Sequence, residues 1–346
     1  MMQVHFVVPG PLDQRTGGYL YDRRIVEGLR AQGTTVTVHE LAGRFPAVDE
    51  AAGAAAAAAL EAMAEGVSVI DGLALPAFAG LRTRLPPSWI ALVHHPLALE
   101  TGLATEQVDT LARIESQLLP LARRVIVTSS HTASDLAAYQ VPPDHIGVVL
   151  PGTDSAPLAR GSGGPGMALL CVASLTPRKG HLVLLEALGR LLDLDWRLSC
   201  VGSAERDSAC AHAIREAIRE LGLGQRIQLV GEHEEAALGP FYDAADLFVL
   251  ASHHEGYGMV LADALARGLP IVSTTAGAIP DTVPSSAGLL VPPGDAEALA
   301  GALARAIAEP ELRARLAEGA RQARAHLPGW ADAVRAFAAE VDRVAG

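Results

Sequence analysis

The sequence has few of the residues that build covalently or metal-stabilised scaffolds. Its 346 residues include only three cysteines, and no pair of them has the C-x-x-C spacing. An odd count without that spacing predicts neither a disulfide framework nor a zinc site. Cys171 and Cys200 fall in apolar runs typical of strands, so we expect buried thiols at both positions.

Long apolar runs and basic runs are also missing. No window of about 18 residues is uninterruptedly apolar, and the first residues lack the basic and apolar regions of a secretion signal. The net charge is 27 − 39 = −12, which argues against nucleic acid and strongly anionic membranes as partners. We expect a soluble, cytoplasmic protein, and the acidic charge favours soluble partners over a membrane lipid.

Two common catalytic motifs are absent. A G-x-G-x-x-G fingerprint would follow the first apolar run directly, but Gly10, Gly17 and Gly18 do not fit it, which disfavours a nicotinamide dehydrogenase. No G-x-S-x-G elbow is present, which disfavours a hydrolase. Gly17 and Gly18 instead open a predicted helix, where the backbone allows close approach of a ligand. A plain turn is the alternative.

What the chain does contain is a repeated alternation of short apolar runs and helical segments, which predicts parallel α/β sheets. The alternation stops in a segment rich in Gly, Pro and Ser and then restarts, so two domains are expected. We place an N-terminal domain at residues 1–155, a linker at 156–166, a C-terminal domain at 167–328 and a final helix at 329–346. The predicted strands begin at Val4, Thr34, Val67, Trp89, Val125, Ile146, Leu169, Trp196, Ile227, Leu247, Pro270 and Gly288.

The most informative stretch runs from Ser252 to Gly268. It lies between two apolar runs and reads as a Gly-rich turn followed by a short helix that ends at Gly268. The first N–H groups of such a helix attract anions, above all phosphate. Glu255 lies in the turn and Asp263 in the helix. Because carboxylates accept hydrogen bonds from hydroxyls, a phosphate with a sugar on each side would fit this site. Ordinary loop acids are the alternative.

This stretch resembles the signature of the retaining GT-B-fold glycosyltransferases of family 4, S-x-x-E-G-[FY]-G followed by a second acid. The resemblance continues at Lys179, in a segment similar to G-R-L-x-x-x-K-G, and at the G-L-L-V-P-P-G-D sequence that begins at Gly288. It implies two Rossmann-like domains facing a cleft, with the last helix crossing back to the first domain. The implied activity is transfer of a hexosyl group from a UDP- or GDP-sugar to a hydroxyl of an acceptor, with retention of configuration.

The resemblance also implies roles for individual residues. Glu255 would bind hydroxyls of the donor sugar, Asp263 the ribose, Lys179 the diphosphate, and His94 would orient the sugar. The other donor-binding residues implied are Gly17, Gly18, Ser174, Arg178, Gly231, His233, Gly256, Tyr257, Gly258, Met259 and Val260. No cofactor is implied besides the nucleotide-sugar substrate.

No metal is expected. Asp193 and Asp195 spell a D-x-D sequence, but they join a predicted helix to a predicted strand, as a solvated loop. His253 and His254 adjoin Glu255, yet neighbouring residues rarely bind one ion together.

The chain departs from the family pattern at two positions. Ser174 stands where the pattern has arginine, and only Arg178 is nearby to replace the charge that stabilises the leaving group. Asp263 is one methylene shorter than the usual glutamate. Two other function classes therefore stay open: a sugar-nucleotide epimerase or phosphorylase on the same fold, and a non-catalytic nucleotide-sugar binder.

Overall fold

The computed structural model describes residues 2–345 and divides them into two compact units. Of these, the first unit contains residues 2–152 together with 328–345, and the second contains residues 153–327. Segment 156–166 forms no helix or strand and belongs to the second unit, where Arg160 is paired with Asp243. Among the described residues, no helix is both long enough and apolar enough to cross a bilayer.

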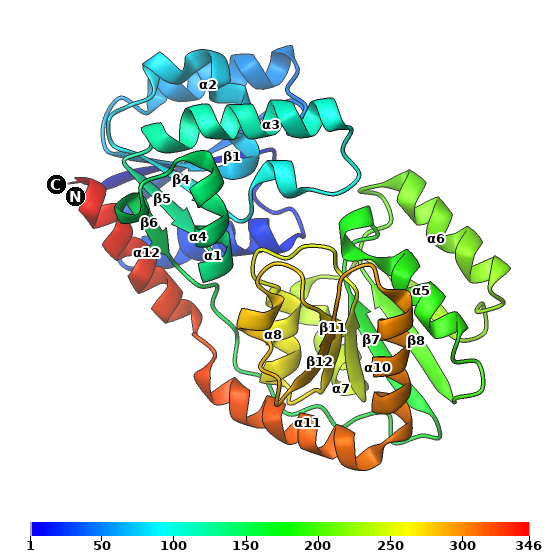
Figure 1. Cartoon of the computed structure of the whole chain (residues 1–346). Coiled ribbons are helices and arrows are strands. Elements are labelled where there is room, and N and C mark those ends of the chain that lie inside the picture. Colours follow the sequence, from blue (N-terminus) through cyan, green and yellow to red (C-terminus); the bar gives the residue numbers. More distant parts are fainter. Residues whose placement is uncertain (1, 346) are drawn as a thin grey trace. The chain divides into compact units, whose positions relative to one another are not determined.

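The first unit is a six-stranded parallel sheet with helices on both faces (Figure 1). The strand order is β2-β1-β3-β4-β5-β6. Its strands are β1 (Gln3–Pro9), β2 (Thr35–Leu41), β3 (Val67–Asp71), β4 (Trp89–Val93), β5 (Arg124–Val127) and β6 (Ile146–Val148). Its helices are α1 (Gly17–Ala31), α2 (Glu50–Ala62), α3 (Thr105–Leu118), α4 (Ser130–Asp135) and α12 (Trp330–Ala345).

The last helix, α12, packs on α1 in this first unit, as the sequence predicted (Figure 1). Phe337 and Val341 on its apolar face are fully buried, and the Phe337 ring lies against Phe6 of β1. Close packing with α1 depends on Gly28, because a Cβ at that position would lie 2.2 Å from a methyl group of Val334. The amphipathic pattern of α12 therefore has its partner within this unit.

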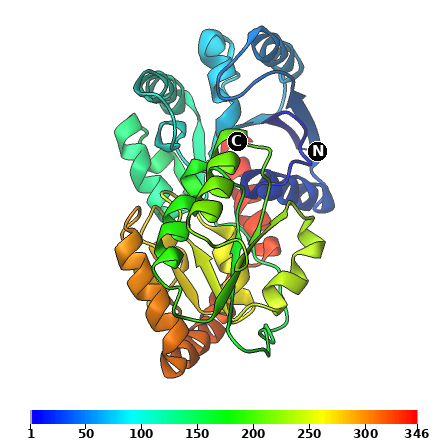
Figure 2. The same cartoon turned by 90° about the vertical axis from the view of Figure 1, so that its right-hand side faces the viewer.

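The second unit is also a six-stranded parallel sheet, with strand order β12-β11-β10-β7-β8-β9. Its strands are β7 (Met167–Val172), β8 (Trp196–Val201), β9 (Ile227–Gly231), β10 (Leu247–Leu250), β11 (Ile271–Thr274) and β12 (Gly288–Val291). Its helices are α5 (His181–Gly189), α6 (Ser208–Glu220), α7 (Gly239–Asp243), α8 (Met259–Ala266), α9 (Ile279–Thr282), α10 (Ala296–Ala308) and α11 (Pro310–Ala323). In Figure 2 the green helices α5 and α6 lie in front of these strands.

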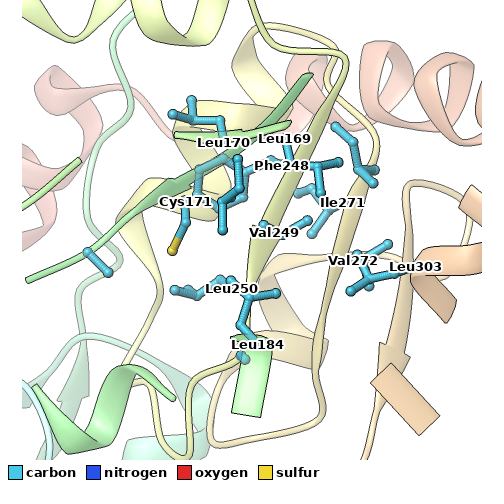
Figure 3. Close-up of a cluster of buried hydrophobic side chains, with 14 of the residues drawn as sticks. Leu169, Leu170, Cys171, Leu184, Phe248, Val249, Leu250, Ile271, Val272 and Leu303 are labelled. Carbon is cyan, nitrogen blue, oxygen red and sulfur yellow. The ribbon is translucent and has the colours of Figure 1, made fainter. Parts of the chain in front are cut away.

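The core of the second unit is built from strands that are apolar on both faces. Leu169 and Leu170 of β7 lie beside Phe248 of β10, with Leu184 of α5 and Leu303 of α10 packed nearby (Figure 3). Such continuous apolar runs are expected for a parallel sheet that helices cover on both sides. Figure 3 also shows the Cys171 thiol within this core, and both Cys171 and Cys200 are buried, as predicted.

The strand orders locate the point where ligands bind in folds of this kind. In each sheet, successive strands are added first on one side of the starting strand and then on the other. In the first unit this change of direction lies between β1 and β3. In the second unit it falls between β7 and β10. Loops that follow the carboxyl ends of such neighbouring strands diverge and leave room for a ligand.

Candidate functional site

The second unit brings Glu255, Lys179 and Arg178 together at the carboxyl ends of β7 and β10. An oxygen of Glu255 accepts hydrogen bonds from Lys179 Nζ and from Ser252 Oγ, both at 2.6 Å. Its other oxygen lies 3.6 Å from a guanidinium nitrogen of Arg178. Glu255 is only 5% exposed, so this carboxylate has exchanged water for two cations and a hydroxyl.

The loop that carries the two cations is fixed against the end of β10. Gly180 has a φ of +67°, and a Cβ there would lie 1.9 Å from the carbonyl oxygen of Ala251. His253 donates its backbone N–H to the Arg178 carbonyl, and the Arg178 guanidinium donates to the His254 carbonyl. Glycine at position 180 thus allows the contact that places Lys179 against Glu255.

A third loop supports Glu255 from behind. The Ala278 N–H donates to the Glu255 carbonyl at 2.8 Å, and a Cβ at Gly277 would lie 2.2 Å from the same oxygen. Thr282 Oγ1 donates to the Tyr257 carbonyl, which holds the far side of the turn. The turn around Glu255 is therefore determined by packing and hydrogen bonds, so Glu255 keeps one position.

The charges of this cluster favour an anion as ligand. Burial alone would raise the pKa of Glu255, but Lys179 and Arg178 outweigh it and lower the pKa to about 2. The carboxylate is thus ionised at neutral pH, with two cations beside it. Helix α8 begins next to this cluster at Met259, and its N-cap, Gly258, offers no side-chain cap. Cations beside a helix N-terminus suit a phosphate group.

The other residues predicted in this unit are distributed around the same edge of the sheet. Val260 lies in the first turn of α8, and Asp263 lies further along it, near Arg267. Ser174 follows β7, and Gly231 ends β9, where its carbonyl accepts the Gly202 N–H. The ring of His233 packs on Phe241 with centroids 5.0 Å apart.

The predicted residues of the first unit form a separate cluster within that unit. His94 follows β4, and its Nε2 lies 3.1 Å from Asp22 of α1 and 3.3 Å from Asp71, the last residue of β3. A Cβ at Gly18 would lie 3.2 Å from the His94 ring. A glycine at position 18 therefore leaves room for the His94 ring. This contact accounts for the glycine without a ligand.

Sequence reasoning found His94 but missed both of its carboxylate partners. Asp22 is 1% exposed and Asp71 is 4% exposed. Asp71 carried a usable signal, because it is the polar residue that closes a buried parallel strand. Asp22 carried none, since a lone acid within a helix is usually solvated.

These three side chains are also where a metal ion would be sought. The ligand atoms of Asp22, Asp71 and His94 all lie within 4.8 Å of one another, the one such group among residues 2–345. In the present geometry Nε2 of His94 is within hydrogen-bonding distance of both carboxylates, so a proton on that nitrogen joins the three groups. Asp193 and Asp195 of the D-x-D sequence lie in the loop before β8 and do not belong to the group.

Comparison with known proteins agrees with this geometry. A family model for glycosyl transferases group 1 matches residues 163–323, and a model for glycosyltransferase family 4 matches residues 21–156. The chain belongs to the family 4 glycosyltransferases. The two models meet close to the boundary between the units, so each unit matches its own model.

Curated relatives of this family are similar to the chain over part of their length. D-inositol 3-phosphate glycosyltransferase of Corynebacterium efficiens is 32% identical in an alignment 257 positions long, which covers 67% of this chain and 61% of the relative. The MMP alpha-(1->4)-mannosyltransferase of Mycolicibacterium hassiacum is 27% identical over 74% of this chain and 66% of its own length. The chain thus matches about six tenths to two thirds of these relatives.

Solved structures show the GT-B fold. Sucrose-phosphate synthase from Thermosynechococcus elongatus superposes with a TM-score of 0.84 at 23% identity, covering 98% of both chains. Anabaena Alr3699/HepE in complex with UDP-glucose gives a TM-score of 0.78 at 17% identity, covering 99% of this chain and 100% of that one. At these identities the likeness establishes the fold alone.

Proposed function

We propose that the protein is a retaining glycosyltransferase that moves a hexosyl group from a UDP- or GDP-sugar to a hydroxyl of a small polar acceptor. The observation that carries the proposal is the buried cluster of Glu255, Lys179 and Arg178 at the adjoining ends of β7 and β10. Family membership and the nucleotide sugars bound by relatives of the same fold support it.

The cluster can perform the two tasks that such a transfer requires. Lys179 and Arg178 would stabilise the charge that develops on the departing diphosphate, together with the N–H groups at the start of α8. Glu255 would accept hydrogen bonds from hydroxyls of the donor sugar, and Asp263 from those of the ribose. The diphosphate would assist removal of the acceptor proton, so no side-chain nucleophile is required, and no metal is proposed.

Arg178 offers a positive charge near the position where the family pattern has arginine and this chain has Ser174. Its guanidinium lies on the same carboxylate as Lys179, so the cluster holds two cations although residue 174 is uncharged. We propose that Arg178 supplies the charge expected from the missing arginine. A binder without turnover is the second candidate, because both Ser174 and Asp263 depart from the family pattern.

The acceptor is proposed from the curated relatives. Their names include an inositol phosphate as acceptor, so phosphorylated and free polyols are the first compounds to test. We expect the reaction to take place in the cytoplasm, where nucleotide sugars are made.

A binding experiment tests the donor first. UDP, GDP, ADP and dTDP and their hexose conjugates would be titrated against the protein while its thermal unfolding is followed. A ligand at 100 times its dissociation constant stabilises the fold by about 2.7 kcal/mol. We expect one nucleotide to raise the midpoint, and its sugar conjugate to raise it further in the wild type but not in Glu255→Gln.

Turnover then separates the candidates. With the identified donor and a panel of polyols, mass spectrometry would detect the glycosylated product and NMR its anomeric configuration. Arg178→Ala should lower turnover more than nucleotide affinity. Donor binding without transfer, hydrolysis or epimerisation would instead identify a binder, and a new sugar nucleotide without acceptor would identify an epimerase.

A further inference from the structure

The His94 cluster of the first unit has an arrangement that its role in the family resemblance does not explain. Three segments contribute one side chain each: Asp22 comes from α1, Asp71 is the last residue of β3, and His94 directly follows β4. Both carboxylates contact the same ring nitrogen, Nε2, at 3.1 and 3.3 Å. A histidine that needed only to be held in place would require one such partner.

The ring has little freedom to turn. Asp71 is itself anchored, because its other oxygen accepts the Leu73 N–H at 2.7 Å. The edge of the ring meets Tyr21 in a T-shaped contact, with ring centroids 5.4 Å apart, and its Cδ2 lies over Gly18. The side-chain hydrogen bonds that residues 2–345 make to this ring are made at Nε2. Nδ1 therefore is the ring nitrogen left for a ligand, and the side chain is 22% exposed.

The two carboxylates also determine the protonation of the ring. Burial alone would lower the pKa of His94, but Asp22 and Asp71 outweigh it and raise the pKa to about 10. Burial raises the pKa of Asp22 to about 7, with His94 lowering it and Asp71 raising it. Tyr21 also faces the ring, and burial raises its pKa well above the usual range.

We propose that Asp22 and Asp71 are positioning residues that fix His94 as a doubly protonated ring, with Nε2–H directed inward and Nδ1–H presented to a substrate oxygen. As a role in catalysis, this inference rests on the proposed glycosyl transfer. It makes His94 a hydrogen-bond donor at every working pH and excludes it as a general base, because a base requires an unprotonated nitrogen. The group that His94 meets is an acceptor: a sugar hydroxyl oxygen or a phosphate oxygen.

The test starts with the state of the ring in the full-length protein. Nitrogen NMR of the histidine rings would be recorded at pH 7.5 for the wild type, Asp22→Asn, Asp71→Asn and the double variant, with His94→Gln to assign the signal. We expect both nitrogens of His94 to be protonated in the wild type and one of them to lose its proton in the double variant. Asp49→Asn, at the cap of α2 in the same unit, is the matched control and should leave the signal unchanged.

Kinetics then test the consequence for the reaction. In Asp71→Asn and Asp22→Asn we expect kcat to fall at least tenfold, with the affinity for the free nucleoside diphosphate within twofold of the wild type. In the double variant the remaining activity should decline as pH rises above about 7, because a ring with an ordinary pKa loses its proton there. The wild type should show no such decline from His94.

Three results would overturn the inference. A neutral His94 in the wild type, or a signal and pH profile unchanged in the double variant, would remove its basis. So would a stoichiometric divalent metal, found by elemental analysis of the purified protein and lost in Asp22→Asn, since the metal would replace the proton on Nε2. Failure of the proposed function looks different, because the wild type would then transfer no sugar while its His94 ring still responded to the two variants.

Discussion

At the scale of single residues, the central interaction is the ion pair that Glu255 makes inside the second unit. Burying charges is favourable only when each is paired and hydrogen-bonded, and Glu255 meets Lys179, Arg178 and Ser252 at once. Under the proposed function, the anionic donor would compete with Glu255 for the two cations, so these stabilising contacts would rearrange when it binds. The proposal thus couples donor binding to stability at this carboxylate.

Glu255 should make the free energy of unfolding decrease as the pH falls. Its pKa of about 2 in the folded state lies below the ordinary value of 4.5, so its contribution is complete above pH 5 and is lost as the pH falls toward 2. The difference of about 2.5 pH units corresponds to about 3 kcal/mol at neutral pH. In urea denaturation, Glu255→Gln should therefore be less stable than the wild type at pH 7, and the gap should narrow by pH 3.

Glu311→Gln, an exposed position on α11, is the matched control and should follow the wild type at both pH values. A gap between Glu255→Gln and the wild type that stays constant from pH 7 to pH 3 would contradict the ion-pair argument.

At the scale of elements, helix α3 holds the loop that carries His94. Glu115 of α3 is buried, and its two oxygens accept the backbone N–H groups of Leu97 and Ala98. These two residues follow His94-His95-Pro96 at the end of β4. The Glu115 side chain thus accepts backbone hydrogen bonds that a neighbouring strand would accept within the sheet.

Glu115 should make stability depend on pH in the opposite direction. Burial raises its pKa to about 7, against the hydrogen bonds from Leu97 and Ala98. The folded state then holds this proton more tightly than the unfolded chain, so the contribution is present at pH 4.5 and is lost as the pH rises through 7. Glu115→Gln should show a smaller fall in stability between pH 5 and pH 8.5 than the wild type, by about 3 kcal/mol at most.

Glu106→Gln, an exposed residue of the same helix, should keep the dependence of the wild type. Since Asp22 titrates in the same range in all three proteins, only the difference between variants is diagnostic. A Glu115→Gln protein with the full dependence would contradict this role for Glu115.

The elements themselves could be predicted because strands and helices leave local patterns. Each of the twelve predicted strands is present, and their ends differ by a few residues at most. The turn at Glu255 could be predicted because glycines and an acid follow a buried strand within a few residues. The clusters that join distant segments could not be predicted in this way. Asp22 and Asp71 are 49 residues apart (71 − 22 = 49), and no local pattern shows which acids contact the same histidine nitrogen.

At the scale of the whole molecule, the second unit is one continuous segment of chain, whereas the first is interrupted. Residues 153–327 contain a complete six-stranded sheet with its own buried core. The cluster of Glu255, Lys179 and Arg178 lies wholly inside this segment. The segment therefore has what an independent domain requires.

Residues 153–327 expressed alone should fold cooperatively and bind the same nucleoside diphosphate as the full chain. Circular dichroism during urea denaturation would measure the first, and calorimetric titration the second. Residues 1–152 alone should not fold, because Phe337 and Val341 of α12 would be missing from their core. A segment 153–327 that folds but does not bind would show that the donor needs residues of the first unit.

The interruption also sets an order of events during synthesis. The first half of the chain leaves the ribosome with the surface that α12 covers on α1, β3, β4 and β5 still exposed, because α12 is made only after residue 327. At roughly 5–20 residues per second, the first unit waits on the order of ten seconds or more for its last helix. During that time the second unit, made later, can already be complete. Until its final helix is made, the nascent chain therefore exposes the apolar surface of the first unit that Phe337 and Val341 later cover.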